Sequence, residues 1–234
     1  MGKVVVLGSG TSTGVPQIGC TCRVCTSGDN RDRRLRCSAL VEVDGVRLLI
    51  DCGPDFREQM IRLDDFAPIA EEETCRKLMQ RMPYCFAEHP YPGVPRIPLV
   101  SVEPGKVFCV ENAAGRVVEV LPLRVMHGKL PILGFRIGKI AWITDMTEMQ
   151  EETYGMLQGV EVLFMNALRI EPHWTHQNLE QALERVKRIG AAQTFLIHMS
   201  HQMGLHAEVD AALPQGVKLA YDGLEVMFPS LSTQ

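Results

Sequence analysis

The chain has 234 residues, a net charge of −4 and a hydrophobic fraction of 46%, which is ordinary for a soluble globular protein. The acidic balance argues against a protein that binds long nucleic acid, although it does not exclude a small phosphorylated ligand. The longest apolar runs are far too short to span a bilayer, and the N-terminus turns to glycine before a signal-peptide core could form. We therefore expect a cytoplasmic protein that does not bind membranes.

The first half of the chain predicts short strands followed by helices. Asp44-Gly45 is a strong hairpin signal between two apolar runs. Residues 84–104 contain five prolines, so this segment reads either as a functional lid or as a surface wrap. The elements expected here are strands at 4–7, 39–43 and 46–50, and helices at 54–63 and about 71–82.

The second half mixes strands and helices. Thr175 is the expected N-cap of one helix, and Gly190 ends it. A last hairpin is expected around Asp222-Gly223. This order predicts a layered α/β protein with helices packed outside two sheets. The elements are strands at 107–110, 117–126, 133–137, 140–144, 160–166, 195–198, 217–221 and 224–228, and helices at about 148–157, 176–189 and 206–213.

Three cysteines lie within six residues, at Cys20, Cys22 and Cys25. Zinc favours sulfur and nitrogen ligands in a tetrahedron, so a distant histidine would have to supply the fourth ligand. Reactive or buried thiols without metal are the alternative, but three close thiols in a glycine-rich loop have little core to enter. The lone cysteines read instead as buried structural thiols: Cys52, Cys75, Cys85 and Cys109.

The tetrapeptide His198-Met199-Ser200-His201 follows the apolar run at 194–197. If the extended backbone continues, side chains three residues apart point to opposite faces. One imidazole can then face a reaction cleft while the other faces the cysteine cluster.

A second ligand set comes from the ends of three expected strands, where His127, Asp145 and His198 each follow an apolar run. Ligands of α/β sheets gather at that edge. Alone, each histidine would be structural and the aspartate a turn residue; together they suit zinc, manganese or iron. His176 is a candidate general acid or phosphate donor at a helix start, whereas His173 reads as an ordinary first-turn residue.

With these motifs in place, the chain resembles a metallo-β-lactamase-fold hydrolase. The closest resemblance is to the PhnP-like phosphoribosyl cyclic phosphodiesterase branch, and ribonuclease Z is more distant. It implies one α/β (α+β) domain over residues 1–234, built as a four-layer αββα sandwich with a two-metal site between the sheets. The stretches that carry the resemblance are 8–16, 20–25, 49–53, 127–129, 144–145, 198–201 and 221–223.

By resemblance, His127 and His198 would each bind one catalytic metal, zinc or manganese, and Asp145 would bridge the two. His176 would contact the substrate phosphate or protonate the leaving group, and Asp51 would orient the site from behind these ligands. The substrate would be a small cyclic or ribose-linked phosphate diester, and a homodimer is compatible with the family. A structural zinc would be held by Cys20, Cys22, Cys25 and His201.

One departure from the family is large. No histidine precedes His89, so the H-x-H-x-D-H metal motif expected after the first helix is missing. The flanks still resemble the family, which predicts excision of a strand-plus-crossover segment, roughly 30 residues long, at about Ile69-Ala70. Four readings follow: a phosphodiesterase, a catalytically silent variant with only a structural zinc, a ribonuclease Z-like enzyme, or a cysteine-based redox protein.

Overall fold

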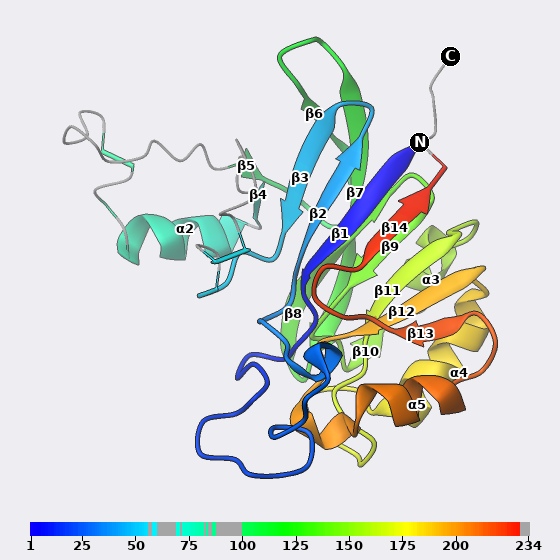
Figure 1. The fold of residues 1–234 in the computed structure, drawn as a ribbon. Coiled ribbons are helices and arrows are strands. Elements are labelled where there is room, and N and C mark those ends of the chain that lie inside the picture. The colour runs from blue at the N-terminus through cyan, green and yellow to red at the C-terminus, as the bar shows by residue number, and fades with distance from the viewer. Residues whose placement is uncertain are drawn as a thin grey trace.

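Two β-sheets face each other in the computed structural model (Figure 1), which describes residues 1–55, 58–59, 69–70, 72–81, 83, 86–87 and 100–229. Within these residues, one sheet has four antiparallel strands in the order β14-β1-β2-β3. The first and last strands of the chain's described part lie side by side in this sheet, because β1 pairs with β14. The strands are β1 (Gly2–Gly8), β2 (Ser38–Val43), β3 (Val46–Ile50) and β14 (Glu225–Phe228).

The second sheet has eight strands in the order β10-β7-β8-β9-β11-β12-β13, with β6 paired to β7. Its first part is antiparallel, and β9, β11, β12 and β13 run parallel. The parallel strands therefore deliver their carboxyl ends to one edge. The bounds are β6 (Phe108–Glu111), β7 (Val117–His127), β8 (Leu130–Ile137), β9 (Ile140–Ile143), β10 (Glu148–Met149), β11 (Val162–Asn166), β12 (Gln193–Ile197) and β13 (Val217–Leu219).

Side-chain alternation along the central strands separates two hydrophobic cores. In β9, Trp142 packs between the sheets, while Ala141 and Ile143 face the helices. In β11, Phe164 and its neighbour Leu163 divide in the same way. This period of two is what a strand buried on both faces requires. The mixed α/β sandwich with two sheets is thus confirmed.

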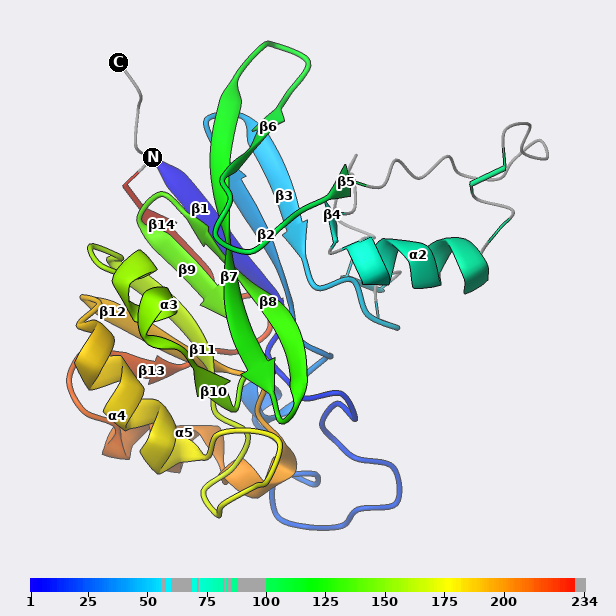
Figure 2. The same cartoon turned by 180° about the vertical axis from the view of Figure 1, so that it is seen from behind.

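Three helices cover the outer face of the eight-stranded sheet (Figure 2). These are α3 (Glu151–Met156), α4 (Leu179–Ile189) and α5 (His206–Ala212). A fourth, α2 (Glu72–Arg81), lies beside the short strands β4 (Ile69–Ala70) and β5 (Val100–Ser101), which pair in parallel. Of the described residues, no helix is long and apolar enough to cross a membrane.

The structure corrects four expectations. The last hairpin is wrong: β13 pairs with β12 and β14 with β1, so the chain crosses between the sheets near Asp222. The N-cap of α4 is Asn178, not Thr175, because Asn178 and Gln181 form a reciprocal capping box. Residues 148–149 form the strand β10 beside β7, so α3 begins at Glu151 and not at about residue 148. Two lone thiols, Cys52 and Cys109, are exposed rather than buried.

Other expectations lie outside the described residues. Most of the proline-rich segment at 84–104 belongs there, as do Cys85 and much of the expected helix at 54–63, of which residues 58–59 are helical. Cys75 is buried as expected.

Candidate metal centres

The cysteine loop closes on the histidine that follows β12. His201 Nδ1 lies 3.4 Å from Cys20 Sγ and 3.3 Å from Cys22 Sγ. The three sulfurs and one imidazole nitrogen, with Cys25 as the third thiol, lie within 4.8 Å of one another. Three thiols and one imidazole form the donor set of a closed structural zinc site, so the residues fit that metal.

The protonation of these thiols also fits a cation. A hydrogen bond from the backbone of Cys25 and the contact with His201 lower the pKa of Cys22 to about 6. Burial raises the pKa of Cys25 to about 11. Without a metal, the cluster would therefore hold a mixture of thiol and thiolate near neutral pH. Metal binding would drive all three to the thiolate and release protons.

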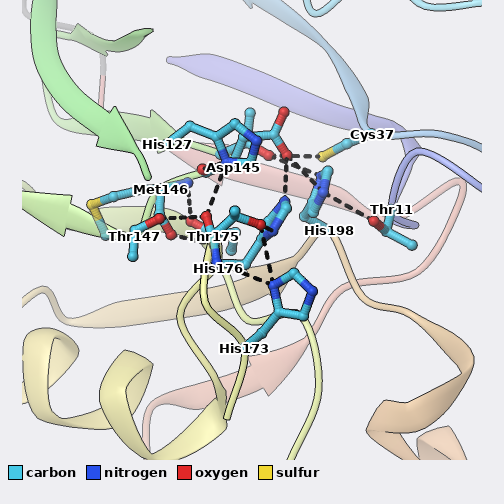
Figure 3. A network of polar contacts seen from close by, with 12 residues as sticks. Thr11, Cys37, His127, Asp145, Met146, Thr147, His173, Thr175, His176 and His198 are labelled. Carbon is cyan, nitrogen blue, oxygen red and sulfur yellow. Dashed lines mark hydrogen bonds and ion pairs between the residues drawn. The ribbon is translucent and has the colours of Figure 1, made fainter. Parts of the chain in front are cut away.

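The second cluster sits where parallel strands of the large sheet end (Figure 3). Asp145 Oδ1 lies 2.6 Å from His198 Nε2 and 3.5 Å from His176 Nε2. That oxygen is buried but has no hydrogen-bond partner of normal geometry. Three atoms that can each bind a metal thus converge on one point, which is the arrangement expected around a cation. These are the residues that group within 4.8 Å.

Charge in this cluster favours the ionised carboxylate. Burial works to raise the pKa of Asp145, but the adjacent His176 and His198 outweigh it and hold that pKa below its ordinary range. The carboxylate is therefore ionised, and available as a ligand, near neutral pH.

Backbone conformation marks the same place. Asp51, Asp145 and His198 all have positive φ, at 61°, 59° and 59°. Among described non-glycine residues, the fourth is Asp44, which belongs to the β2–β3 turn. Each such residue costs about 1 to 2 kcal/mol, and strain of this kind concentrates at functional sites. The turns re-aim the side chains that follow strand ends toward the space between the sheets.

His127 and His176 occupy different places from those expected. His127 ends β7, but it is not in the three-residue cluster; its Nδ1 lies 3.0 Å from the carbonyl oxygens of Asp145 and Thr175. It must donate to them, which leaves its Nε2 without a proton when the ring is neutral. His176 joins the cluster instead, with its ring 4.6 Å from that of His127.

Thr175 joins the histidines to one another. Its backbone N–H donates to His173 Nδ1 at 3.3 Å, so that nitrogen is an acceptor. Its hydroxyl lies 3.2 Å from the same nitrogen and 2.9 Å from His176 Nδ1. The hydroxyl can then donate to His173 and accept from His176 Nδ1, which fixes the His176 ring with its Nε2 toward Asp145. His173, expected to be an ordinary first-turn residue of a helix, is part of this network (Figure 3).

Sequence reasoning missed the hydroxyls and the thiol behind His198. Thr11 Oγ1 lies 3.1 Å from His198 Nε2, and Thr144 Oγ1 lies 3.3 Å from Nδ1. Thr144 also donates to Cys37 Sγ at 3.7 Å. Burial, then the nearby Asp51, raises the pKa of Cys37 well above its usual value, so the thiol stays neutral. Thr11 lies in the glycine-rich turn, which was the available signal.

Asp51 lies close enough to Asp145 and His198 to interact with their charges. It accepts a hydrogen bond from Trp142 Nε1 at 2.9 Å. Burial raises the pKa of Asp51 to about 6, against the effects of Trp142 and His198. The indole thus ties the turn after β3 to the central strand β9, across the interface between the sheets.

Comparison with known proteins shows which proteins share this architecture. Residues 61–199 match the model of the beta-lactamase superfamily domain, which covers more than half of the chain. A crystal structure of a diphosphatase from the PhnP family superposes with a TM-score of 0.85 and 33% identity, covering 96% of each chain. Zinc-bound PqqB from Methylobacterium extorquens superposes with a TM-score of 0.73 over 97% of this chain and 100% of PqqB, at 18% identity, which shows a shared fold.

A curated relative extends beyond this domain. An octanoyltransferase from Porphyromonas gingivalis is 40% identical over 257 positions, which cover 96% of this chain and 51% of the relative. This chain therefore spans about half the length of that protein. The aligned region is also longer than the 234 residues of the chain, so at least 23 of its positions fall in gaps here. Together, the domain match and the PhnP-family structure show that the chain belongs to the beta-lactamase superfamily, in its PhnP-like branch, and has the metallo-β-lactamase fold.

Proposed function

We propose that this chain is a metal-dependent phosphodiesterase that acts on small cyclic or ribose-linked phosphate diesters. The observation that carries the proposal is the convergence of three possible metal-ligand atoms, Asp145 Oδ1, His176 Nε2 and His198 Nε2, within 4.8 Å of one another. Divalent metal binding is supported by this donor set and by the zinc-bound PqqB with the same fold. The diphosphatase of the PhnP family supports phosphate-ester chemistry.

Asp145 and His198 would hold the catalytic cation, zinc or manganese. When bound, such a cation acidifies a water and polarises a phosphoryl oxygen. Thr144 Oγ1 lies beside His198 Nδ1 and fixes the ring, which leaves Nε2 as the nitrogen that would bind the cation. His176 is placed to complete the ligand set or to pass a proton between its Nε2 and the leaving oxygen, since Thr175 orients its other nitrogen. Asp51 would hold the site from behind through Trp142.

The chain should hold fewer catalytic metals than an intact relative. The H-x-H-x-D-H motif is missing, and the gapped alignment with the octanoyltransferase supports a segment lost from this chain. We expect one weakly held catalytic cation instead of a bridged pair, with His127 beside it as a candidate ligand. The structural zinc would occupy Cys20, Cys22, Cys25 and His201 in addition.

Elemental analysis beside a phosphodiesterase assay tests this. The purified chain should contain one tightly bound zinc, take up one further divalent cation, and hydrolyse a ribose cyclic phosphate or a bis-aryl phosphate ester. Two catalytic-site metals per chain would contradict the single-cation proposal. Retention of zinc with no hydrolysis would favour the catalytically silent alternative. If the three loop thiols react freely without a chelator, the zinc assignment fails and a redox role becomes the better account.

The remaining expectations stay proposals. Residues 1–234 would form one domain, act in the cytoplasm on a small phosphate ester, and have no long nucleic acid as partner. Ribonuclease Z activity is the alternative within the enzyme class, and cleavage of a precursor transfer RNA would favour it. A homodimer is a further expectation that sedimentation of the purified chain would test.

A further inference from the structure

The turn that carries Asp145 is held by a side chain of the neighbouring strand. The parallel pairing of β9 with β11 ends at Ile143 and Met165, and Asn166 is the next residue of β11. Asn166 Oδ1 accepts a hydrogen bond from the backbone N–H of Met146 at 3.0 Å, and Asn166 Nδ2 donates to the carbonyl oxygen of Met146 at 2.9 Å. One side-chain amide thus replaces the next rung of the ladder, at the residue directly after Asp145.

The Asn166 amide is itself fixed by a buried network. Asn166 and Gln177 are both fully buried, and Gln177 Nε2 donates to the carbonyl oxygen of Asn166 at 2.5 Å. Arg185 Nη1 donates to Gln177 Oε1 at 3.0 Å, and Arg185 Nη2 donates to the carbonyl oxygen of Thr147 at 2.9 Å. The amide therefore has one favourable orientation, because turning it over would place its NH2 group against the N–H of Met146.

The pairing acts on the peptide bond that follows Asp145. The N–H of this peptide, which belongs to Met146, donates to Asn166, and its carbonyl oxygen, which belongs to Asp145, accepts from His127 Nδ1 at 3.0 Å. A planar peptide held on both sides fixes the ψ angle of Asp145. The φ of Asp145 is 59°, a left-handed conformation that a residue with a Cβ keeps only when its surroundings hold it. The direction of the Asp145 carboxylate therefore depends on Asn166.

We propose that Asn166 is a positioning residue for the Asp145 cluster, because it holds the carboxylate in the direction in which the cluster would bind a divalent cation. Asn166 acts through the backbone of Met146, whereas Asp145 Oδ1 is the atom that lies 2.6 Å from His198 Nε2. Asparagine suits this place, since Met146 offers one donor and one acceptor and an amide offers the matching pair. This role rests on the proposed function only in taking the cluster as the cation site.

Loss of the Asn166 amide should weaken cation binding although no ligand is changed. Removing a group that supports metal ligands lowers metal affinity roughly 10- to 100-fold, so the Mn²⁺ affinity of Asn166→Ala, measured by calorimetry, should fall by that factor. Mn²⁺ is the probe because thiolates favour zinc, so zinc at the thiol cluster should stay in place. Without Mn²⁺, the NMR signals of the ring nitrogens of His176 and His198 should move, since both rings lie beside the Asp145 carboxylate.

Asn166→Asp separates the hydrogen-bond pattern from the shape of the side chain. A carboxylate is close in size to the amide, but it offers only acceptors, so it repels the carbonyl oxygen of Met146. A protonated carboxyl group can donate to that oxygen and accept from the N–H, as asparagine does. The Mn²⁺ affinity of Asn166→Asp, relative to wild type at the same pH, should therefore recover as the pH is lowered. A loss of packing alone would give no such recovery.

Val162→Ala is the matched control, because Val162 is 4% exposed and begins the same strand that Asn166 ends. It should lower the free energy of unfolding, but it should leave the Mn²⁺ affinity and the ring signals of His176 and His198 unchanged. If Asn166→Ala matches Val162→Ala in both readouts, Asn166 has no positioning role. If Asn166→Ala does not fold, Asn166→Asp decides alone, and the absence of any recovery at lower pH would overturn the proposal.

The ring signals distinguish this role from the proposed function. If wild type binds zinc but no Mn²⁺, the single-cation proposal fails, whereas movement of the His176 and His198 signals in Asn166→Ala still supports the positioning role. That movement should become small when Asp145→Asn is already present, because Asn166 acts through Asp145. If wild type binds Mn²⁺ and Asn166→Ala keeps both the affinity and the ring signals of wild type, the cation site stands and the positioning role is wrong.

Discussion

The two candidate metal clusters contain the two histidines of one tetrapeptide, His198 and His201, and differ in how many ligands each provides. His201 meets three thiols from a single loop, whereas His198 meets Asp145 and His176, which follow different strands. The first set offers four ligands, the number that a tetrahedral zinc needs. The second offers three, and the sequence contains no H-x-H-x-D-H stretch.

The difference shows how each site depends on the fold. Three of the four thiol-cluster ligands lie within six residues, so the loss of a distant segment leaves that cluster intact. The Asp145 cluster collects single residues from the ends of several strands, so it loses donors whenever one of those connections is lost. Structural zinc can therefore persist where catalysis has weakened, and the two clusters should respond separately to mutation.

The largest effect is expected at Asp145. Asp145→Asn removes the charge on which His176 and His198 converge, so hydrolysis should fall about 1,000-fold, or about 4 kcal/mol of transition-state stabilisation. Steady-state rates on a bis-aryl phosphate ester measure this, beside the zinc content. The zinc at the thiol cluster should remain. Loss of both metals together would show that the two clusters are not independent.

Much of the thiol cluster was predictable from the sequence, because its spacing is local and its fourth ligand had to be a distant histidine. The Asp145 cluster was predictable in part: strand ends placed Asp145 and His198 at one edge. The grouping of His176 with these two residues was not, because it depends on how the Thr175 hydroxyl holds the His176 ring.

The fold divides in a similar way. Alternation and turn residues predicted most strands, including the β2–β3 hairpin around Asp44-Gly45. They failed for the final pair, because Asp222-Gly223 reads as a hairpin whether the next strand returns or crosses to the other sheet. Asp222 accepts hydrogen bonds from Ser9 at 2.8 Å and from the backbone of Leu35 at 2.7 Å, and these long-range contacts anchor the crossing.

The second-largest effect is expected at the thiol cluster. Cys22→Ser removes one sulfur ligand, so zinc should be lost and the free energy of unfolding should fall by roughly 3 kcal/mol, since metal loss is among the larger single-site effects. Urea denaturation and zinc analysis measure both quantities. Cys109→Ser is the matched control, because Cys109 is an exposed thiol away from the cluster, and it should change neither. If Cys22→Ser and Cys109→Ser have the same zinc content and the same free energy of unfolding, a zinc at the thiol cluster does not stabilise the protein.

A smaller effect concerns Asp51, near the Asp145 cluster, and the pH dependence of the free energy of unfolding. Burial raises the pKa of Asp51 to about 6 in the folded protein, above its value of about 4 in the unfolded chain. The unfolded state therefore releases this proton first, so metal-free protein should lose roughly 2 to 3 kcal/mol of stability as pH rises from about 4 to about 6. In Asp51→Asn this part of the pH dependence should disappear. Denaturation midpoints across that range decide the matter, and parallel curves for the two proteins would count against it.

The smallest effect tests whether a bound zinc or a surface ion pair holds the cysteine loop against α5. Arg23 Nη2 lies 2.6 Å from Glu208 Oε1, but the two side chains are 68% and 58% exposed. Solvent screens such a pair, so Arg23→Ala should cost about 0.5 kcal/mol or less and leave the zinc in place. Chemical denaturation at low and high salt measures it. If Arg23→Ala loses as much free energy of unfolding as Cys22→Ser, the ion pair, and not the metal, holds the loop. A small loss of that free energy would mean that the four metal ligands hold it.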